Sequence, residues 1–215
     1  QGLLTVLALL FTGFKTVTFA ATQFSDVSNV AGVNQHTESF GVSIGDVNND
    51  DLLDIFVSNH RSRPSLYVND GNGGFHDMAP AVSRWVNRPT QDTHGAAFAD
   101  FDNDGDQDLM ISVGTGQATQ FFENNNGKLT DKAVEYGVDF KKLGGRLPVW
   151  LDYNGDRLLD VVMTQFGGVA KLFTQKATGF IENTATVGLL CKQFQYGQLY
   201  DVDNNGRLDF VCPAN

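Results

Sequence analysis

Residues 99–111 read ADFDNDGDQDLMI, an acidic loop that runs directly into a stretch of large apolar residues. Three further segments share this pattern: GDVNNDDLLDIFV at 45–57, LDYNGDRLLDVVM at 151–163 and YDVDNNGRLDFVC at 200–212. Their acidic loops, 46–54, 100–108, 152–160 and 201–209, begin about fifty residues apart. A motif that recurs at a fixed period of this length indicates a repeat architecture.

A second marker has the same period and a constant offset from the acidic loops. It consists of an apolar residue, any residue and an acid, and it occurs as Phe24/Asp26, Phe75/Asp77, Leu129/Asp131 and Phe180/Glu182. Two different motifs that keep a constant spacing from each other along the chain rarely arise without a structural repeat. We therefore assign the repeat region to residues 22–215.

Hydrophobicity alternates with a period of two on both sides of each loop, which is typical of half-buried β-strands. Strands are expected before the loops at 41–45, 95–99, 148–151 and 196–200, and after them at 53–57, 109–113, 159–163 and 208–212. A third strand is expected at 65–68, 120–122 and 171–173, and a fourth contains the second marker. Residues 130–136 are expected to connect two blades.

Four strands per repeat match the blade of a propeller. The sequence thus predicts an all-β fold, a β-propeller built from four-stranded antiparallel blades of about 50 residues. The propeller is expected to be incomplete, with three to four blades.

The acidic loops carry oxygen-bearing side chains at alternate positions, which suits Ca²⁺ because this hard cation takes six to eight oxygen ligands. Positions one, three, five and nine of each loop are the candidate metal ligands. They are Asp46, Asn48, Asp50, Asp54, Asp100, Asp102, Asp104, Asp108, Asp152, Asn154, Asp156, Asp160, Asp201, Asp203, Asn205 and Asp209. Asp and Asn also populate hairpin turns that bind no metal, so simple turn formation is the alternative.

The loops differ at position six, where a left-handed backbone favours glycine. Gly105 and Gly206 satisfy this preference, whereas Asp51 takes the position in the first loop. In the third loop Gly155 stands one place early and Arg157 occupies position six, so this site is expected to be the weakest of the four. An EF-hand is excluded, because the twelfth position always lies in an expected strand and is never the bidentate Glu of that motif.

The four loops resemble the calcium loops of FG-GAP/VCBS repeats. Their companions LYVNDGNGGFHD at 66–77 and FFENNNGKLTD at 121–131 resemble the following half-repeat in bacterial members of the ASPIC/UnbV-associated group. The resemblance implies integrin-α-like propeller blades, an extracellular location, and Ca²⁺ ligands at loop positions one, three, five and nine with a backbone carbonyl near position seven. Such propellers usually carry about seven blades, so the chain is expected to be a fragment, clipped at both ends.

The first residues differ from the rest of the chain, because Leu3 to Phe14 is an almost unbroken apolar run. Its length is typical of a signal-peptide core, with cleavage expected near Ala20 or Ala21. Residues 1–21 are therefore interpreted as a clipped signal peptide, and the mature chain is expected to be secreted, periplasmic or on the cell surface, without a membrane span. A buried N-terminal strand is the alternative.

Charge and the remaining motifs exclude several functions. A net charge of −10 and the absence of a Lys/Arg cluster argue against a nucleic-acid partner. The four histidines, His36, His60, His76 and His94, show no zinc-like spacing and are expected in surface or turn positions. No serine elbow or phosphate-binding loop occurs, and the chain is expected not to be an enzyme.

The sequence favours a calcium-binding extracellular scaffold that contacts a protein or cell-surface ligand. A carbohydrate-binding propeller is one alternative, in which Trp85, Trp150 or Tyr136 would stack on sugar rings unless both tryptophans pack between blades. An accessory propeller of a larger secreted enzyme is another. Cys191 and Cys212 are the only cysteines, and they form either a disulfide or two unrelated buried thiols. The oligomeric state is left open.

Overall fold

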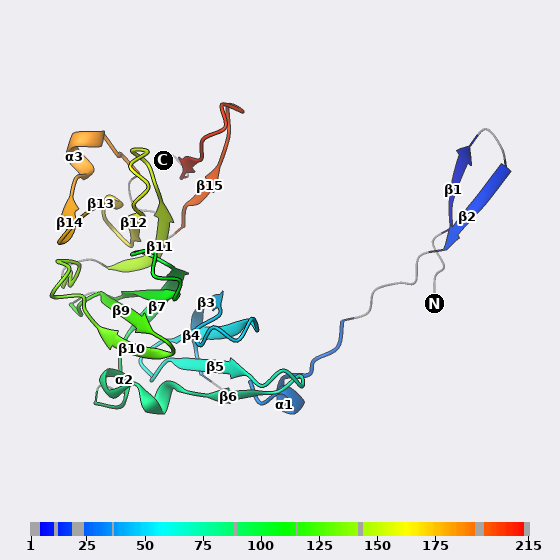
Figure 1. The fold of residues 1–215 in the computed structure, drawn as a ribbon, viewed down its shortest axis with the longest axis horizontal. Helices are drawn as coiled ribbons and strands as arrows, with labels where there is room; N and C mark the ends of the chain where they lie inside the picture. Colours follow the sequence, from blue (N-terminus) through cyan, green and yellow to red (C-terminus); the bar gives the residue numbers. More distant parts are fainter. Residues whose placement is uncertain are drawn as a thin grey trace.

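The computed structural model describes residues 24–35, 37–87, 90–114, 116–141, 144–191 and 196–212, together with the backbone of 5–10 and 13–18. Within these ranges the chain forms three four-stranded antiparallel sheets and two two-stranded ones. The four-stranded sheets stack one against the next (Figure 1). The predicted all-β fold of incomplete propeller blades is confirmed.

Each blade is a meander whose neighbours in sequence pair with each other. Blade 1 contains β3 (Ser39–Gly45), β4 (Asp54–Asn59), β5 (Ser65–Asn69) and β6 (Phe75–Asp77). Blade 2 contains β7 (Thr93–Ala99), β8 (Asp108–Val113), β9 (Gln120–Asn125) and β10 (Lys128–Asp131). Blade 3 contains β11 (Gly145–Leu151), β12 (Asp160–Gln165), β13 (Lys171–Lys176) and β14 (Gly179–Glu182). The fourth repeat contributes β15 (Gln198–Tyr200) and β16 (Asp209–Val211).

The register of the first two strands is the same in all four repeats. The residue before each acidic loop pairs with the ninth residue of that loop, giving the pairs Gly45 with Asp54, Ala99 with Asp108, Leu151 with Asp160 and Tyr200 with Asp209. Strand pairing therefore fixes both ends of every loop, so each loop connects its two strands over the same separation.

Adjacent blades meet closely where their first strands cross. A Cβ atom on Gly41 of β3 would lie 2.2 Å from the carbonyl oxygen of His94 in β7. The equivalent residue one repeat later is Gly95, where a Cβ would lie 2.1 Å from the carbonyl oxygen of Arg146 in β11. Glycine is required at both positions, because any side chain would push the first strands of adjacent blades apart.

Trp85 fills the space between blades 1 and 2. It lies in α2 (Ser83–Asn87) and is fully buried. Its ring is 5.6 Å from that of Phe56 in blade 1 and 5.1 Å from that of Phe122 in blade 2. The indole Nε1 donates a hydrogen bond of 3.0 Å to Oε1 of Gln120, so its polar atom is satisfied as well.

The other two aromatic residues considered for sugar stacking also take part in packing. Nε1 of Trp150 donates to the carbonyl oxygen of Ala97 at 3.4 Å, across the boundary between blades 3 and 2. The ring of Tyr136 lies 5.2 Å from that of Phe101, in an edge-on arrangement. Packing between blades is thus confirmed for both tryptophans, and none of the three residues forms a free stacking platform.

The acid of the second marker caps the turn that leaves each blade. A carboxylate oxygen of this residue accepts the backbone N–H two residues further on in all four repeats, from Asp26 to Ser28, Asp77 to Ala79, Asp131 to Ala133 and Glu182 to Thr184. Such local bonds start short helices and turns. Asp77, Asp131 and Glu182 stand at the ends of β6, β10 and β14, so the three full blades are left through the same capped turn.

The connections themselves are short. They include α1 (Ser28–Ala31), η1 (Ala79–Ala81) and α3 (Thr184–Val187). Residues 133–137 form a turn after β10, as expected for an inter-blade connection. The strand expected at Phe24 is wrong, because residues 24–27 have no strand structure and Phe24 is 95% exposed. At this first marker only the bond from the Ser28 N–H to Asp26 is kept.

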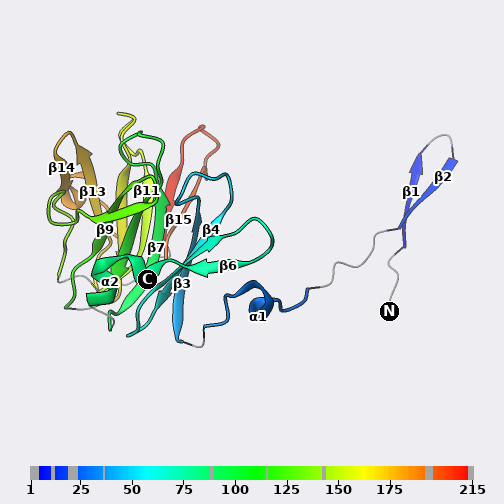
Figure 2. The ribbon, with the colours of Figure 1, turned by 60° about the horizontal axis from the view of Figure 1, so that its bottom comes forward.

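The N-terminal apolar run forms a hairpin of β1 (Thr5–Leu10) and β2 (Gly13–Thr18), which pair with each other. The hairpin lies apart from the blades in both ribbon views (Figures 1 and 2). The expected cleavage near Ala20 or Ala21 lies outside the described residues, so the signal peptide stays a prediction. No helix in the described part of the chain is long and apolar enough to cross a membrane.

Cys191 and Cys212 form a disulfide with a Cα–Cα distance of 6.1 Å. Cys191 also accepts a hydrogen bond through its backbone oxygen from the N–H of Ala170 in blade 3. The disulfide therefore joins the end of the β15–β16 hairpin to a segment packed on blade 3, and it decides between the two alternatives left by the sequence.

We predict that Trp85→Ala lowers the free energy of unfolding by about 3–5 kcal/mol, because it leaves a large cavity between two blades. Val134→Ala is the control, since Val134 is 77% exposed, and it should change stability by less than about 0.5 kcal/mol. Urea unfolding followed by circular dichroism measures both. Equal effects of the two substitutions would show that Trp85 does not hold the blades together.

Candidate metal centres

The four acidic loops share one backbone conformation. Positions four and six have positive φ in every loop: Asn49, Asn103, Gly155 and Asn204 at position four, and Asp51, Gly105, Arg157 and Gly206 at position six. The prediction from sequence rested on position six alone. Gly155 is therefore not displaced but occupies a second left-handed position. The turn of the third loop is the same as in the others, which removes one reason for ranking it last.

The first carboxylate of each loop organises this turn. In the second loop Oδ1 of Asp100 accepts the N–H of Asp104, and its Oδ2 accepts the N–H of Gly105, both at 3.1 Å. The same two N–H groups, at positions five and six, bind the first carboxylate in the other loops, which are headed by Asp46, Asp152 and Asp201. Position one thus has a structural role whether or not a cation is bound.

The ninth residue connects the loop to the rest of its blade. In the second loop Oδ2 of Asp108 accepts the N–H of Phe101 at 3.1 Å, and Oδ1 accepts the N–H of Asn124 in β9 at 2.8 Å. Asp54 and Asp160 make the same pair of bonds in blades 1 and 3. These carboxylates are almost completely buried. Each one holds its loop against the third strand.

Burial raises the pKa values of these carboxylates. It raises the pKa of Asp108 to about 7, while the N–H groups of Asn124 and Phe101 act in the opposite direction. Burial likewise raises the pKa of Asp160 to about 6 and raises that of Asp54. The hydrogen bonds therefore compensate the buried negative charge only in part. A nearby cation would supply the remaining compensation.

Two loops bring three carboxylates together. Oxygens of Asp100, Asp102 and Asp108 lie within 4.8 Å of one another, and so do those of Asp201, Asp203 and Asp209. Oxygens on opposite sides of one Ca²⁺ are about 4.6–5.2 Å apart, because each lies about 2.3–2.6 Å from the ion. The donor atoms of both loops thus fit a single calcium ion.

The fifth residue of the second loop is not part of this group. Oδ1 of Asp104 accepts the N–H of Asp106 at 2.8 Å. Position five makes this same local bond in the other loops, through Asp50, Asp156 and Asn205. Metal binding at position five stays a prediction. In the described geometry the side-chain oxygen of this residue closes the turn.

The first and third loops have Asn in place of Asp at position three. Nδ2 of Asn48 donates to Asp50, and Nδ2 of Asn154 donates to Asp156, each at 2.9 Å. The acidic residues of these two fully described loops do not form a group of three like those above. In the first loop, however, Oδ1 of Asn48 is buried without a hydrogen-bond partner among the described residues. This orphan acceptor is suited to a cation.

Neighbouring repeats also contact each other through the loops. Nδ2 of Asn124 in blade 2 donates to the carbonyl oxygen of Val47 in the first loop at 2.8 Å. Nε2 of Gln175 in blade 3 donates to the carbonyl oxygen of Phe101 in the second loop at 3.0 Å. The first and second loops are therefore each held both by their own blade and by the next one.

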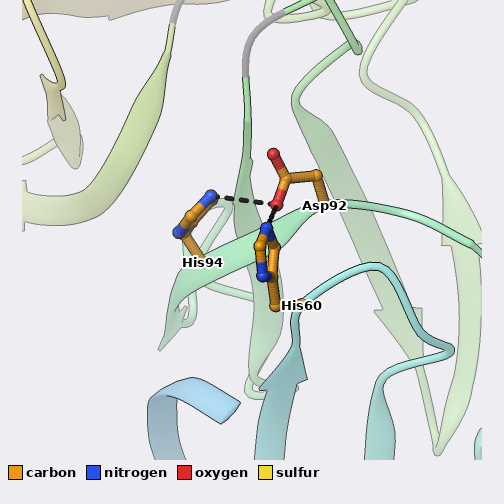
Figure 3. A group of neighbouring side chains, drawn as sticks. All are labelled: His60, Asp92 and His94. Atoms are coloured by element: carbon orange, nitrogen blue, oxygen red, sulfur yellow. Dashed lines mark ion pairs between the residues drawn. The ribbon is translucent and has the colours of Figure 1, made fainter. Parts of the chain in front are cut away.

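A further cluster lies outside the acidic loops and was not found from the sequence. His60, Asp92 and His94 come together between blades 1 and 2 (Figure 3). The expectation of surface positions is wrong for His94, which is 8% exposed. It holds for the exposed His76, and His36 lies outside the described residues. Spacing could not reveal the cluster, because its members occupy different phases of two repeats.

Comparison with known proteins supports the repeat assignment. Residues 46–111 match the model of the FG-GAP-like repeat, from the first acidic loop into β8. The chain is 31% identical over 137 residues to cartilage acidic protein 1 of Mus musculus and 30% identical over 139 residues to that of Xenopus tropicalis. Each match covers 63% of this chain but only 21% of the relative. The chain thus spans about a fifth of the length of these relatives.

We predict opposite effects for two substitutions at position six. Arg157→Gly should stabilise the fold by about 0.5 kcal/mol, because glycine removes the strain of a left-handed arginine. Gly105→Ala should destabilise it by about 1 kcal/mol, although a Cβ at Gly105 would meet no described atom within 4 Å. Urea unfolding in a chelator measures both effects without a contribution from metal. Changes of the same sign would show that backbone strain does not govern this position.

Proposed function

We propose that this chain, which carries the FG-GAP-like repeat in residues 46–111, is a calcium-binding extracellular scaffold that acts through protein or cell-surface contacts and not through catalysis. The observation that carries the proposal is the convergence of three carboxylates in each of the second and fourth loops. Oxygen-only donor sets of this kind select hard cations such as Ca²⁺.

The proposed ligands are the loop residues described above. Asp100, Asp102 and Asp108 would hold the ion of the second loop, and water or backbone carbonyls would complete its coordination. The first loop is supported by the orphan oxygen of Asn48. The third is supported by its identical backbone conformation. Bound calcium would also offset much of the net charge of −10.

The ion would act mainly on stability. It would bridge the start of each loop to the first residue of the second strand, where Asp108 already joins the loop to β9. A ligand that binds only the folded state stabilises that state. Carboxylates committed to calcium are held ionised and are poor general acids, which favours a binding role over a catalytic one.

Two features support a location outside the cytoplasm. The disulfide between Cys191 and Cys212 is typical of oxidising compartments. The apolar run at the N-terminus has the length of a signal-peptide core. The proposed contact surface is formed by the loops at the edges of the blades, since connecting loops on a rigid scaffold usually carry the binding residues.

We predict that the chain melts at a higher temperature in millimolar Ca²⁺ than in a chelator, because the folded state alone assembles the sites. Titration calorimetry should give dissociation constants of about 10⁻⁴ to 10⁻³ M or tighter. Asp102→Ala should remove the ion of the second loop and shrink the calcium-dependent shift, because alanine leaves no ligand oxygen at position three. Glu135→Ala is the matched control, because it also removes one carboxylate, at a side chain that is 61% exposed.

The proposal would be abandoned if the melting curves in chelator and in calcium coincided. That result would leave the loops as turns that bind no metal. The assignment of the second loop would fail if Asp102→Ala and Glu135→Ala bound the same number of calcium ions, because Asp102 would then not be a ligand.

A further inference from the structure

The cluster of His60, Asp92 and His94 lies where blade 1 meets blade 2. His60 follows β4 directly, and Asp92 and His94 stand at the start of β7. An isolated β-bridge pairs His60 with Asp92. The acidic loop of blade 1 precedes β4, so the cluster is at the opposite end of that strand from the calcium loop. The two kinds of site are therefore independent of each other.

Both imidazoles face one carboxylate oxygen (Figure 3). Nε2 of His60 is 2.8 Å from Oδ1 of Asp92, and Nε2 of His94 is 3.1 Å from the same atom. Ligand atoms around a tetrahedral Zn²⁺ are about 3.3–3.5 Å apart, since each lies about 2.0–2.2 Å from the metal. Small outward movements of the two rings would seat an ion among the three atoms.

The facing atoms lack other partners. Nε2 of His94 and Oδ1 of Asp92 are both buried without a hydrogen bond of good geometry among the described residues. Only 10% of the His94 side chain is exposed, compared with 18% for His60. Among the described residues these two buried atoms meet only each other and Nε2 of His60, at ion-pair distances. Buried polar atoms that lack well-directed hydrogen bonds suit a site for an ion.

Glu38 orients the ring of His60 for metal binding. Its Oε2 is 3.1 Å from Nδ1 of His60, on the far side of the ring from Asp92. A proton on Nδ1 would be donated to this carboxylate, which leaves the lone pair of Nε2 directed at the cluster. A carboxylate that holds the outer nitrogen of a histidine is the usual support of a metal-binding imidazole.

The backbone around the cluster is rigid. The N–H of His60 donates to the carbonyl oxygen of Glu38 at 2.7 Å, and the N–H of Gly114 donates to that of Asp92 at 2.7 Å. The ring of Phe40 covers the cluster from one side, with its centroid 4.8 Å from His60 and 5.3 Å from His94. Backbone hydrogen bonds thus anchor the segments that carry the ligands, and a half-exposed aromatic ring lies against the two imidazoles.

Carboxylates and an arginine near the cluster have opposite effects on cation binding. Asp92 and Glu38 favour a cation. Burial, and then the positive charge of Arg146, lower the pKa of His94. The donor set contains two nitrogens, so it differs from the oxygen-only loops and suits zinc better than calcium.

We propose that His60, Asp92 and His94 bind a divalent transition-metal ion, with Zn²⁺ the best match, at the junction of blades 1 and 2. The metal has one ligand directly after β4 of blade 1 and two at the start of blade 2, with His94 in β7 and Asp92 immediately before it. It therefore fastens the two blades together at the end of the strands away from the acidic loops. Glu38 is a positioning residue that acts through His60.

The test uses the full chain in millimolar Ca²⁺, so that zinc does not compete for empty acidic loops. Zinc titration by calorimetry should show one site per chain, and zinc should raise the melting temperature. His60→Gln should weaken zinc binding by more than about 100-fold, and Glu38→Gln by about 10- to 100-fold. His76→Gln is the matched control, because His76 is an exposed histidine of blade 1 outside the cluster, and it should bind zinc as the unchanged chain does.

Cobalt provides a second measurement that does not depend on stability. Co²⁺ bound by the cluster should give visible absorption bands of low-coordinate nitrogen and oxygen ligation, and His60→Gln should abolish them. If His94→Gln fails to fold, His60→Gln and Glu38→Gln still decide the question, because both residues are partly exposed. Zinc affinity that is the same in His60→Gln, Glu38→Gln and the unchanged chain would overturn the proposal.

Discussion

The fold of the three full blades depends on one buried carboxylate in each, that of the ninth loop residue. In blade 2 this is Asp108, which accepts one N–H from its own loop and one from β9. The two bonds fix the loop, the second strand and the third strand relative to one another. The register of the hairpin then follows, because the same residue pairs with the one before the loop. The raised pKa of Asp108 shows that this arrangement holds a charge that the protein compensates incompletely.

Contacts between repeats extend this local order along the chain. The side-chain amides of Asn124 and Gln175 reach back to the loop of the preceding blade. Trp85 fills the gap between blades 1 and 2, and Gly41 and Gly95 allow the inner strands to approach. In such a stack, stability is close to a sum of the repeats and their nearest-neighbour interfaces. A change in one loop is therefore expected to act on two blades.

The repeat, the strands and the acidic loops could be predicted because their requirements are local. Alternating apolar residues specify strands, and loop residues such as Asp100 bond to N–H groups only a few positions away. The role of Gly155 was misjudged, since Asn takes the same left-handed position in the other loops. The marker at Phe24 was misread as a strand, because its acid serves a cap. The cluster of His60 and His94 could not be predicted, because it forms only when two blades stack.

The disulfide between Cys191 and Cys212 makes the last hairpin sensitive to reductants, unlike blades 1 to 3. Those blades are held by buried side chains and by strand pairing across four strands, none of which responds to reductants. The β15–β16 pair has only two strands, which alone are marginally stable in water. Reduction would thus release the end of the hairpin while the three full sheets stay folded. The molecule would loosen in steps from one end, and a thiol reagent could separate local from global unfolding.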